Sequence, residues 1–201
     1  MSSGAPHSPM TAGEYLAWER EQRDKHEFHH GEIFAMAGGS PRHNALCAAV
    51  IRDIGVAVRG GECRMLTSDQ RVSLEEGRRY VYPDATLICG RLELEPSTSD
   101  VVTNPTAVIE VLSKSTERYD RGGKWVRYRA LASLDDYLLV SQRTVSVEHF
   151  QRQDDGSWRY TAAGAGERVT LSSGAAFAVD DIYDGVFDLP GDEDDDEAPG
   201  P

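Results

Sequence analysis

Two apolar runs in the middle of the chain each contain one acidic residue, and they constrain the fold more than any other feature. The first run covers residues 80–89 and contains Asp84, and the second covers residues 106–113 and contains Glu110. Both runs are typical of buried β-strands. A carboxylate inside a buried strand costs free energy unless it is paired or binds a cation. If the two strands are neighbours, these carboxylates lie side by side and predict a site for a hard divalent metal.

The rest of the chain predicts a mixed α/β (α+β) fold. We expect helices at about residues 11–23, 43–59, 118–131 and 180–186. The other expected strands are a hairpin over residues 28–36, followed by 63–67, 70–74, 137–140, 145–150, 158–161 and 168–171. This order of elements predicts one mixed central β-sheet flanked by helices.

The length of 201 residues suits one domain with a sizeable core, which we expect over residues 10–189. Residues 1–9 are predicted to be a flexible leader, and residues 190–201, with their acidic run, a disordered acidic tail. The sequence has no apolar run near the roughly 18–20 residues that a membrane helix needs. Its N-terminus also lacks the features of a signal peptide. We therefore expect a cytoplasmic protein with no membrane association.

The net charge of −13 argues at first against a nucleic-acid partner. The charge is uneven, however, because the acidic run of the tail contributes six negative charges and leaves −7 for the remainder. Residues 114–129 contain six basic and only two acidic side chains, directly after the Glu110 strand. Arg118, Arg121 and Arg127 are therefore candidates to contact a nucleic-acid backbone, although a solvated helix face explains them equally well.

The cysteines and the N-terminal histidines are expected to be structural. Cys47, Cys63 and Cys89 are far apart in the sequence, which argues against a disulfide framework and against a structural zinc site. We expect them to be small core residues. His29 and His30 are adjacent and therefore point to opposite faces of a strand, so surface positions are favoured over a metal cluster.

Hydrolysis of a phosphodiester requires a metal, carboxylates that hold it and a cation that stabilises the transition state. Asp84 and Glu110 are suited to hold Mg²⁺ (or Mn²⁺), and Lys124, on the helix expected after Glu110, is suited to be the cation. Glu27 is a second-rank candidate for the metal site, with a solvated hairpin residue as the alternative. His43 is a candidate general base or phosphate contact, with a plain helix-entry residue slightly favoured.

The motifs around these residues resemble the Uma-type family of restriction-endonuclease-like proteins, a large bacterial group in the PD-(D/E)XK nuclease superfamily. The resemblance covers roughly residues 10–189. It is carried by Pro83-Asp84, Ile109-Glu110-Val111-Leu112-Ser113, Ser115-Thr116, Lys124 and Tyr128, and by His26-Glu27-Phe28, Gly31-Glu32-Ile33, Met36-Ala37-Gly38, His43 and Asp180-Asp181-Ile182-Tyr183.

The resemblance implies a restriction-endonuclease-like core and a metal-dependent endonuclease that acts on DNA. It also implies that Asp84 and Glu110 bind the divalent metal, with the main-chain carbonyl of Val111 as a third ligand. Leu112 stands where the superfamily motif has a lysine, and Lys124 would have to replace that lysine. The alternative is a catalytically inactive nuclease-fold module with a nucleic-acid-binding or regulatory role. A homodimer would suit cleavage of both strands of a duplex.

Overall fold

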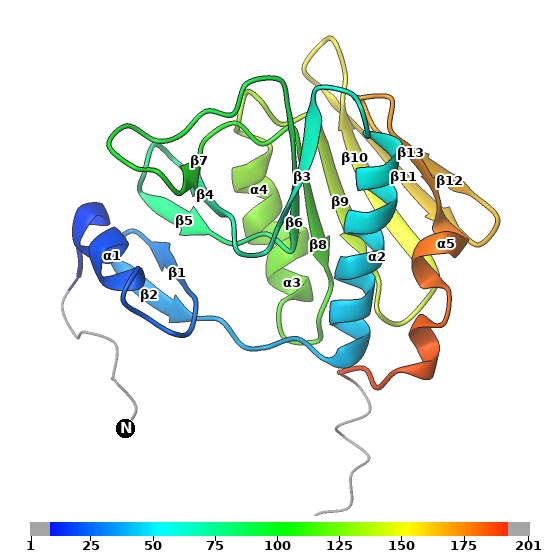
Figure 1. Cartoon of the computed structure of the whole chain (residues 1–201), viewed down its shortest axis with the longest axis horizontal. Helices are drawn as coiled ribbons and strands as arrows, with labels where there is room; N and C mark the ends of the chain where they lie inside the picture. The colour runs from blue at the N-terminus through cyan, green and yellow to red at the C-terminus, as the bar shows by residue number, and fades with distance from the viewer. Residues whose placement is uncertain (1–8, 193–201) are drawn as a thin grey trace, which may run out of the picture.

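The computed structural model describes residues 9–192, which fold around a six-stranded mixed sheet (Figure 1). The strand order is β11-β10-β9-β8-β6-β3, in which β8 and β9 are parallel and the other neighbours are antiparallel. These strands are β3 (Cys63–Thr67), β6 (Ala85–Cys89), β8 (Ala107–Val111), β9 (Asp136–Val140), β10 (Ser146–Arg152) and β11 (Trp158–Gly164).

A five-stranded sheet at the N-terminal side has the order β2-β1-β5-β4-β7. Its strands are β1 (His26–His29), β2 (Glu32–Ala35), β4 (Arg71–Leu74), β5 (Arg79–Val81) and β7 (Val101–Val102). Helix α1 (Ala12–Glu19) begins at a capping box formed by Thr11 and Glu14, and its Tyr15 stacks on Phe28 and Tyr80 of this sheet. The helix is shorter than the sequence predicted.

Helix α2 (Pro41–Ala57) covers one face of the six-stranded sheet (Figure 1). Ser40 caps its start, and proline is well tolerated at the first helical position. Leu46, Val50 and Ile54 recur at helical spacing and form a core with the sheet. The C-terminal elements complete this face, namely β12 (Arg168–Thr170), β13 (Ala176–Ala178), α5 (Val179–Tyr183) and the 3₁₀ turn η2 (Val186–Asp188).

The opposite face of the six-stranded sheet packs against a helical segment and the N-terminal sheet. This segment consists of α3 (Glu117–Tyr119), the π-helical turn η1 (Asp120–Lys124) and α4 (Trp125–Tyr128). Side chains of β8 alternate between the two faces, so Ile109 belongs to the core under α2 and Val108 to the core under α4. Glu110 shares the face of Val108, which directs it towards the helical segment.

The mixed sheet flanked by helices is confirmed, but three details differ from the sequence prediction. The N-terminal strands form a separate sheet, and the helix expected at 118–131 is interrupted by the π turn. Asp84 lies in a bend just before β6 rather than in the middle of a strand. Pro83 explains this, because proline cannot donate to a β-ladder and usually interrupts a strand.

The prediction against a disulfide was wrong. Antiparallel pairing places Cys63 of β3 directly opposite Cys89 of β6, and the two side chains form a disulfide with their Cα atoms 3.9 Å apart. The register of the strands, which sequence spacing does not reveal, brings them together. The free Cys47 on α2 is half-buried and packs against the main core, as expected.

The predicted leader and tail lie mostly outside the described residues. Of the leader only Pro9 is described, and of the tail only residues 190–192. The carbonyl of Pro190 accepts a hydrogen bond from the backbone of Arg42, and the Asp192 carboxylate accepts one from Gln142, so this short stretch is held against the domain. Within residues 9–192, the structure contains no helix that is both long and apolar enough to cross a membrane.

Candidate active site

A pocket of about 450 Å³ opens where β6 begins and β8 ends, next to the first turn of α2. All five candidate catalytic residues from the sequence line it, namely Glu27, His43, Asp84, Glu110 and Lys124. The residues come from both sheets, from α2 and from the π-helical turn. The fold therefore brings together side chains that are up to 97 positions apart in the sequence.

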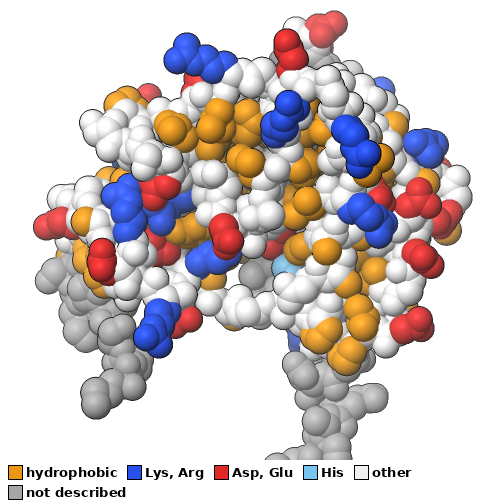
Figure 2. Space-filling view, viewed as in Figure 1, with side chains coloured by type: hydrophobic (Ala, Val, Ile, Leu, Met, Phe, Trp, Pro, Cys, Tyr) orange, Lys and Arg blue, Asp and Glu red, His pale blue; other side chains and the backbone are white. Residues whose placement is uncertain are grey.

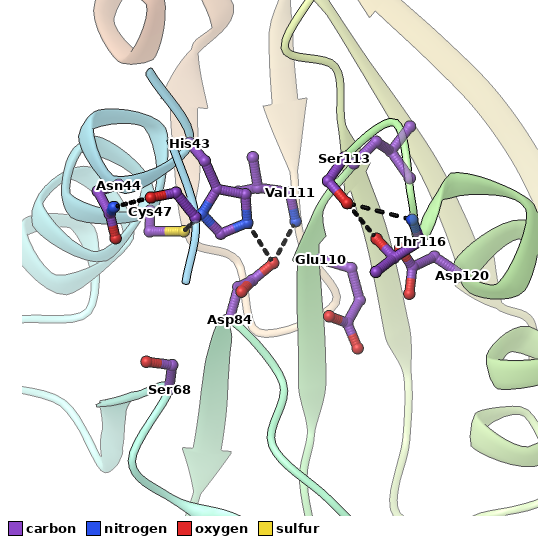
Figure 3. Close-up of polar contacts among 12 residues, drawn as sticks. His43, Asn44, Cys47, Ser68, Asp84, Glu110, Val111, Ser113, Thr116 and Asp120 are labelled. Atoms are coloured by element: carbon purple, nitrogen blue, oxygen red, sulfur yellow. Dashed lines mark hydrogen bonds and ion pairs between the residues drawn. The ribbon is translucent and has the colours of Figure 1, made fainter. Parts of the chain in front are cut away.

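Asp84 and Glu110 lie on neighbouring segments. Ala85 pairs with Ile109, and continuing this antiparallel register by one step places Asp84 beside Glu110. The Asp84 Oδ2 atom accepts a hydrogen bond of 2.7 Å from the backbone N–H of Val111 (Figure 3). Val111 therefore contacts the site through its N–H, whereas the role expected of its carbonyl as a metal ligand stays a prediction.

The Glu110 carboxylate is buried, and its Oε1 atom accepts two hydrogen bonds. The donors are Lys124 Nζ at 3.0 Å and the Tyr128 hydroxyl at 3.1 Å. Burial raises the pKa of the Glu110 carboxyl well above its usual range; the Lys124 ammonium opposes this, and the Asp120 and Asp84 carboxylates add to it. Within the described part of the chain, Oε2 accepts no hydrogen bond, so this oxygen is free to bind a cation.

Lys124 lies at the centre of a group of carboxylates. Its Nζ atom is 3.0 Å from Glu110, 3.1 Å from Asp120 and 3.8 Å from Glu27. Burial alone would lower the pKa of Lys124, but the three carboxylates outweigh it and hold the pKa well above its usual range. The side chain is therefore a fixed positive charge beside Glu110, where the sequence predicted a replacement for the lysine missing at Leu112.

The packing of the π-helical turn accounts for one of the two glycines that precede Lys124. A Cβ atom at Gly123 would lie 2.7 Å from the ring of Tyr119, whereas at Gly122 it would meet no atom within 4 Å. Gly123 is therefore required by the close approach of the Tyr119 ring. The turn also directs both Asp120 and Lys124 into the protein, where both are buried.

Glu27 is a buried member of the site rather than a solvated hairpin residue. Its Oε2 atom is 2.9 Å from His29 Nε2, and the Tyr119 hydroxyl is 3.4 Å from the same histidine nitrogen. Burial alone would raise the pKa of Glu27, but the hydrogen bond from His29 and the charge of Lys124 outweigh it, and the pKa is lowered. His29 is thus half-buried in the network, which corrects the expectation that it lies on the surface.

His43 lies in the first turn of α2 and faces Asp84 (Figure 3). Its Nε2 atom is 3.4 Å from Asp84 Oδ2, and its Nδ1 atom is 3.6 Å from Cys47 Sγ. A Cβ atom at Gly39 would lie 2.5 Å from Nδ1, so glycine leaves room for the ring. Burial alone would lower the pKa of His43, but the contact with Asp84 raises it on balance. The contact with Asp84 thereby stabilises the imidazolium, while the predicted roles of general base and phosphate contact both stay predictions.

The three arginines predicted to contact nucleic acid differ in their surroundings. Arg121 forms ion pairs with Glu117 and Glu148, and Arg127 pairs with Glu75, while Arg118 is exposed. Basic and acidic side chains are interspersed over the face shown in Figure 2 rather than forming one basic surface. A contact of these arginines with nucleic acid stays a prediction.

Negative charge is in excess around the pocket, and the residues fit a hard divalent cation. Three carboxyl groups (Glu27, Glu110 and Asp120) surround the ammonium of Lys124, and a fourth, that of Asp84, interacts electrostatically with Glu110. Carboxylate oxygens are the ligands that Mg²⁺ and Mn²⁺ prefer. Asp120 was not among the predicted site residues, although its position four residues before Lys124 is the spacing of a helical ion pair.

Comparison with known proteins supports the family resemblance. The model of the Uma2 family, described as "Putative restriction endonuclease", matches residues 12–180. The chain is 38% identical to Uncharacterized protein slr1290 of Synechocystis sp. (strain ATCC 27184 / PCC 6803 / Kazusa), over 92% of this chain and 97% of that protein. It is 35% identical to Uncharacterized protein sll1609 of the same strain, over 76% of this chain and 86% of that protein.

A solved structure has the same fold. It is the crystal structure of a protein from Anabaena variabilis ATCC 29413 that is described as a putative nuclease. The TM-score is 0.71 at 16% sequence identity, over 89% of this chain and 99% of that chain. The restriction-endonuclease-like core predicted from the sequence is therefore confirmed as a fold.

Proposed function

Since this chain belongs to the Uma2 family, described as "Putative restriction endonuclease", we propose that it is a metal-dependent endonuclease that hydrolyses phosphodiester bonds in DNA. The observation that carries this proposal is the position of Lys124 Nζ, 3.0 Å from the buried Glu110 carboxylate and among further carboxylates. The excess carboxylates can bind a divalent cation. The fixed ammonium can contact a phosphate bound beside that cation.

Asp84 and Glu110 would hold Mg²⁺ or Mn²⁺ through the oxygens that face the pocket. When bound, the cation would supply polarisation of the phosphoryl oxygen and a lowered pKa for a water molecule. The N–H of Val111 fixes the Asp84 carboxylate, and Tyr128 fixes that of Glu110, so neither needs to reorganise before it binds the cation. A carbonyl ligand from Val111 is part of the same proposal.

Lys124 stabilises the negative charge that develops on the phosphoryl group during attack. Asp120 and Glu27 hold its ammonium in place from two sides, at 3.1 and 3.8 Å. His43, held by its contact with Asp84, donates a hydrogen bond to a phosphate oxygen of the substrate. The exposed Arg118 contacts the DNA backbone beyond the pocket, with Arg121 and Arg127 released from their carboxylates on binding.

The wider setting of this activity is also proposed rather than tested. We also propose a single domain over residues 10–189, a cytoplasmic location, and a homodimer, which would suit cleavage of both strands of a duplex. The inactive nuclease-fold module remains the second candidate, because Leu112 stands in place of the motif lysine and the chain is acidic.

Cleavage of supercoiled plasmid DNA with millimolar Mg²⁺ or Mn²⁺ tests the proposal. We expect metal-dependent cleavage that is lost in Asp84→Asn and in Glu110→Gln. The matched control is Asp69→Asn, which removes a largely exposed carboxylate that pairs with Lys25 and leaves cleavage unchanged. Cleavage by both site variants at the wild-type rate rejects the site, and DNA binding without any cleavage by the wild-type chain favours the inactive module.

A further inference from the structure

Next to the carboxylates of the pocket lies a second group of metal-binding side chains. His43, Cys47 and Asp84 each offer one ligand atom, and these atoms all lie within 4.8 Å of one another. His43 and Cys47 are four positions apart on α2 and therefore project from the same face of the helix. Asp84 reaches them from the bend before β6 (Figure 3). The endonuclease chemistry proposed above gives Cys47 no role.

The three ligand atoms lie within 4.8 Å of one another, somewhat further apart than the ligand atoms of a bound tetrahedral ion. Typical zinc bonds are about 2.3 Å to sulfur and 2.0–2.2 Å to nitrogen or oxygen, which gives edges of roughly 3.3–3.7 Å between ligand atoms. The observed separations are 3.4 Å from His43 Nε2 to Asp84 Oδ2 and 3.6 Å from His43 Nδ1 to Cys47 Sγ. These two contacts involve different ring nitrogens, and one imidazole binds an ion through only one of them, so the side chains must move together by roughly 1 Å to reach tetrahedral edges.

The ligand types distinguish this group from the carboxylate pair. Imidazole and thiolate favour zinc and neighbouring transition metals, whereas Mg²⁺ prefers oxygen. We propose that His43, Cys47 and Asp84 form a site for a transition-metal dication of the zinc type, separate from the Asp84–Glu110 cation site but sharing Asp84 with it. A bound ion displaces the proton of a coordinating thiol, and this displacement costs part of the binding free energy.

The fourth position of such an ion faces the pocket. His43 and Asp84 line the pocket, while Cys47 closes the site from behind, towards the core. Three protein ligands and one open position are typical of zinc sites that exchange ligands. Because Asp84 serves both sites, we infer that bound zinc occupies this carboxylate, weakens Mg²⁺ binding and inhibits the nuclease. This inhibition rests on the proposed function. The binding of zinc itself does not.

Titration of the metal-free, full-length chain with Co²⁺ tests the site without reference to cleavage. A thiolate bound to Co²⁺ gives a near-ultraviolet charge-transfer absorption. We expect this absorption at one equivalent in the wild-type chain, its loss in Cys47→Ser, and an affinity of that variant for Zn²⁺ at least about tenfold weaker. The matched control is the double variant Cys63→Ser/Cys89→Ser, which removes the disulfide cysteines and should keep the absorption.

Absence of the charge-transfer absorption in the wild-type chain, or its persistence in Cys47→Ser, overturns the proposed site. Circular dichroism of each variant establishes that it is folded. In the plasmid assay with Mg²⁺, Cys47→Ser should cleave like the wild type and require at least about tenfold more Zn²⁺ for inhibition. Equal inhibition of the two proteins rejects the shared use of Asp84. If the wild-type chain does not cleave DNA, the spectroscopic result still decides whether the site exists.

Discussion

Replacing Lys124 by methionine should expose how much the ammonium stabilises the carboxylates around it. Methionine retains most of the aliphatic volume but removes the charge at 3.0 Å from Glu110 and 3.1 Å from Asp120. Removing one partner of a buried ion pair typically costs about 3–5 kcal/mol. We expect a loss in this range, because Glu110 and Asp120 are almost completely buried and would repel each other. Protonation of Glu110, whose pKa is already raised, limits the loss.

The free energy of unfolding in urea, measured without metal and with millimolar Mn²⁺, is the assay. The matched control is Arg118→Met, which removes an exposed charge from the same helical segment and should change the free energy of unfolding by no more than about 0.5 kcal/mol. Mn²⁺ should recover more stability in Lys124→Met than in the wild type, because the cation replaces the lost positive charge. A loss below about 1 kcal/mol, equal to that of the control, would refute the electrostatic account of the site.

Three further predictions concern the same electrostatics and the packing around it. Mn²⁺ affinity should fall as the pH falls through the raised pKa of Glu110, because the proton competes with the cation. This fall should occur at a higher pH than for an ordinary glutamate. Calorimetry across pH measures it, and the fall should be missing in Glu110→Gln. Gly122→Ala should stabilise the chain by up to about 1 kcal/mol, whereas Gly123→Ala should destabilise it by clashing with the Tyr119 ring. Thermal unfolding should therefore give a higher melting temperature for Gly122→Ala and a lower one for Gly123→Ala than for the wild type. Asp136→Ala should cost about 3 kcal/mol in urea unfolding without changing Mn²⁺ affinity, since it leaves the buried His149 without its 2.7 Å partner; an unchanged stability would contradict this.

The sequence was sufficient to predict the elements that carry the site. Local periodicity in the sequence predicts the buried runs around Asp84 and Glu110 and the helix α2. Turn residues predict the hairpin before Ile33. The metal-site prediction depended on β6 and β8 being neighbours, and the structure pairs them. The role of Lys124 beside Glu110 could be expected from the missing lysine at Leu112.

Non-local features could not be predicted in the same way. The disulfide between Cys63 and Cys89 depends on the register of β3 against β6, and the burial of His29 depends on how the hairpin packs against Tyr119. Both features arise from contacts between segments that are distant in the sequence, and the local residue pattern gives no signal of such contacts. The inward turn of Asp120 likewise requires the π-helical geometry around Gly123, whereas a regular helix would have been expected there.

Diffraction from crystals soaked in Mn²⁺, recorded at a wavelength where manganese scatters anomalously, tests the central claim most directly. If Asp84 and Glu110 jointly bind one divalent cation, a single anomalous peak should lie within about 2.5 Å of an oxygen of each carboxylate, with Lys124 Nζ still beside Glu110. A peak that contacts only one of the two side chains, or none in the pocket at saturating Mn²⁺, would contradict it.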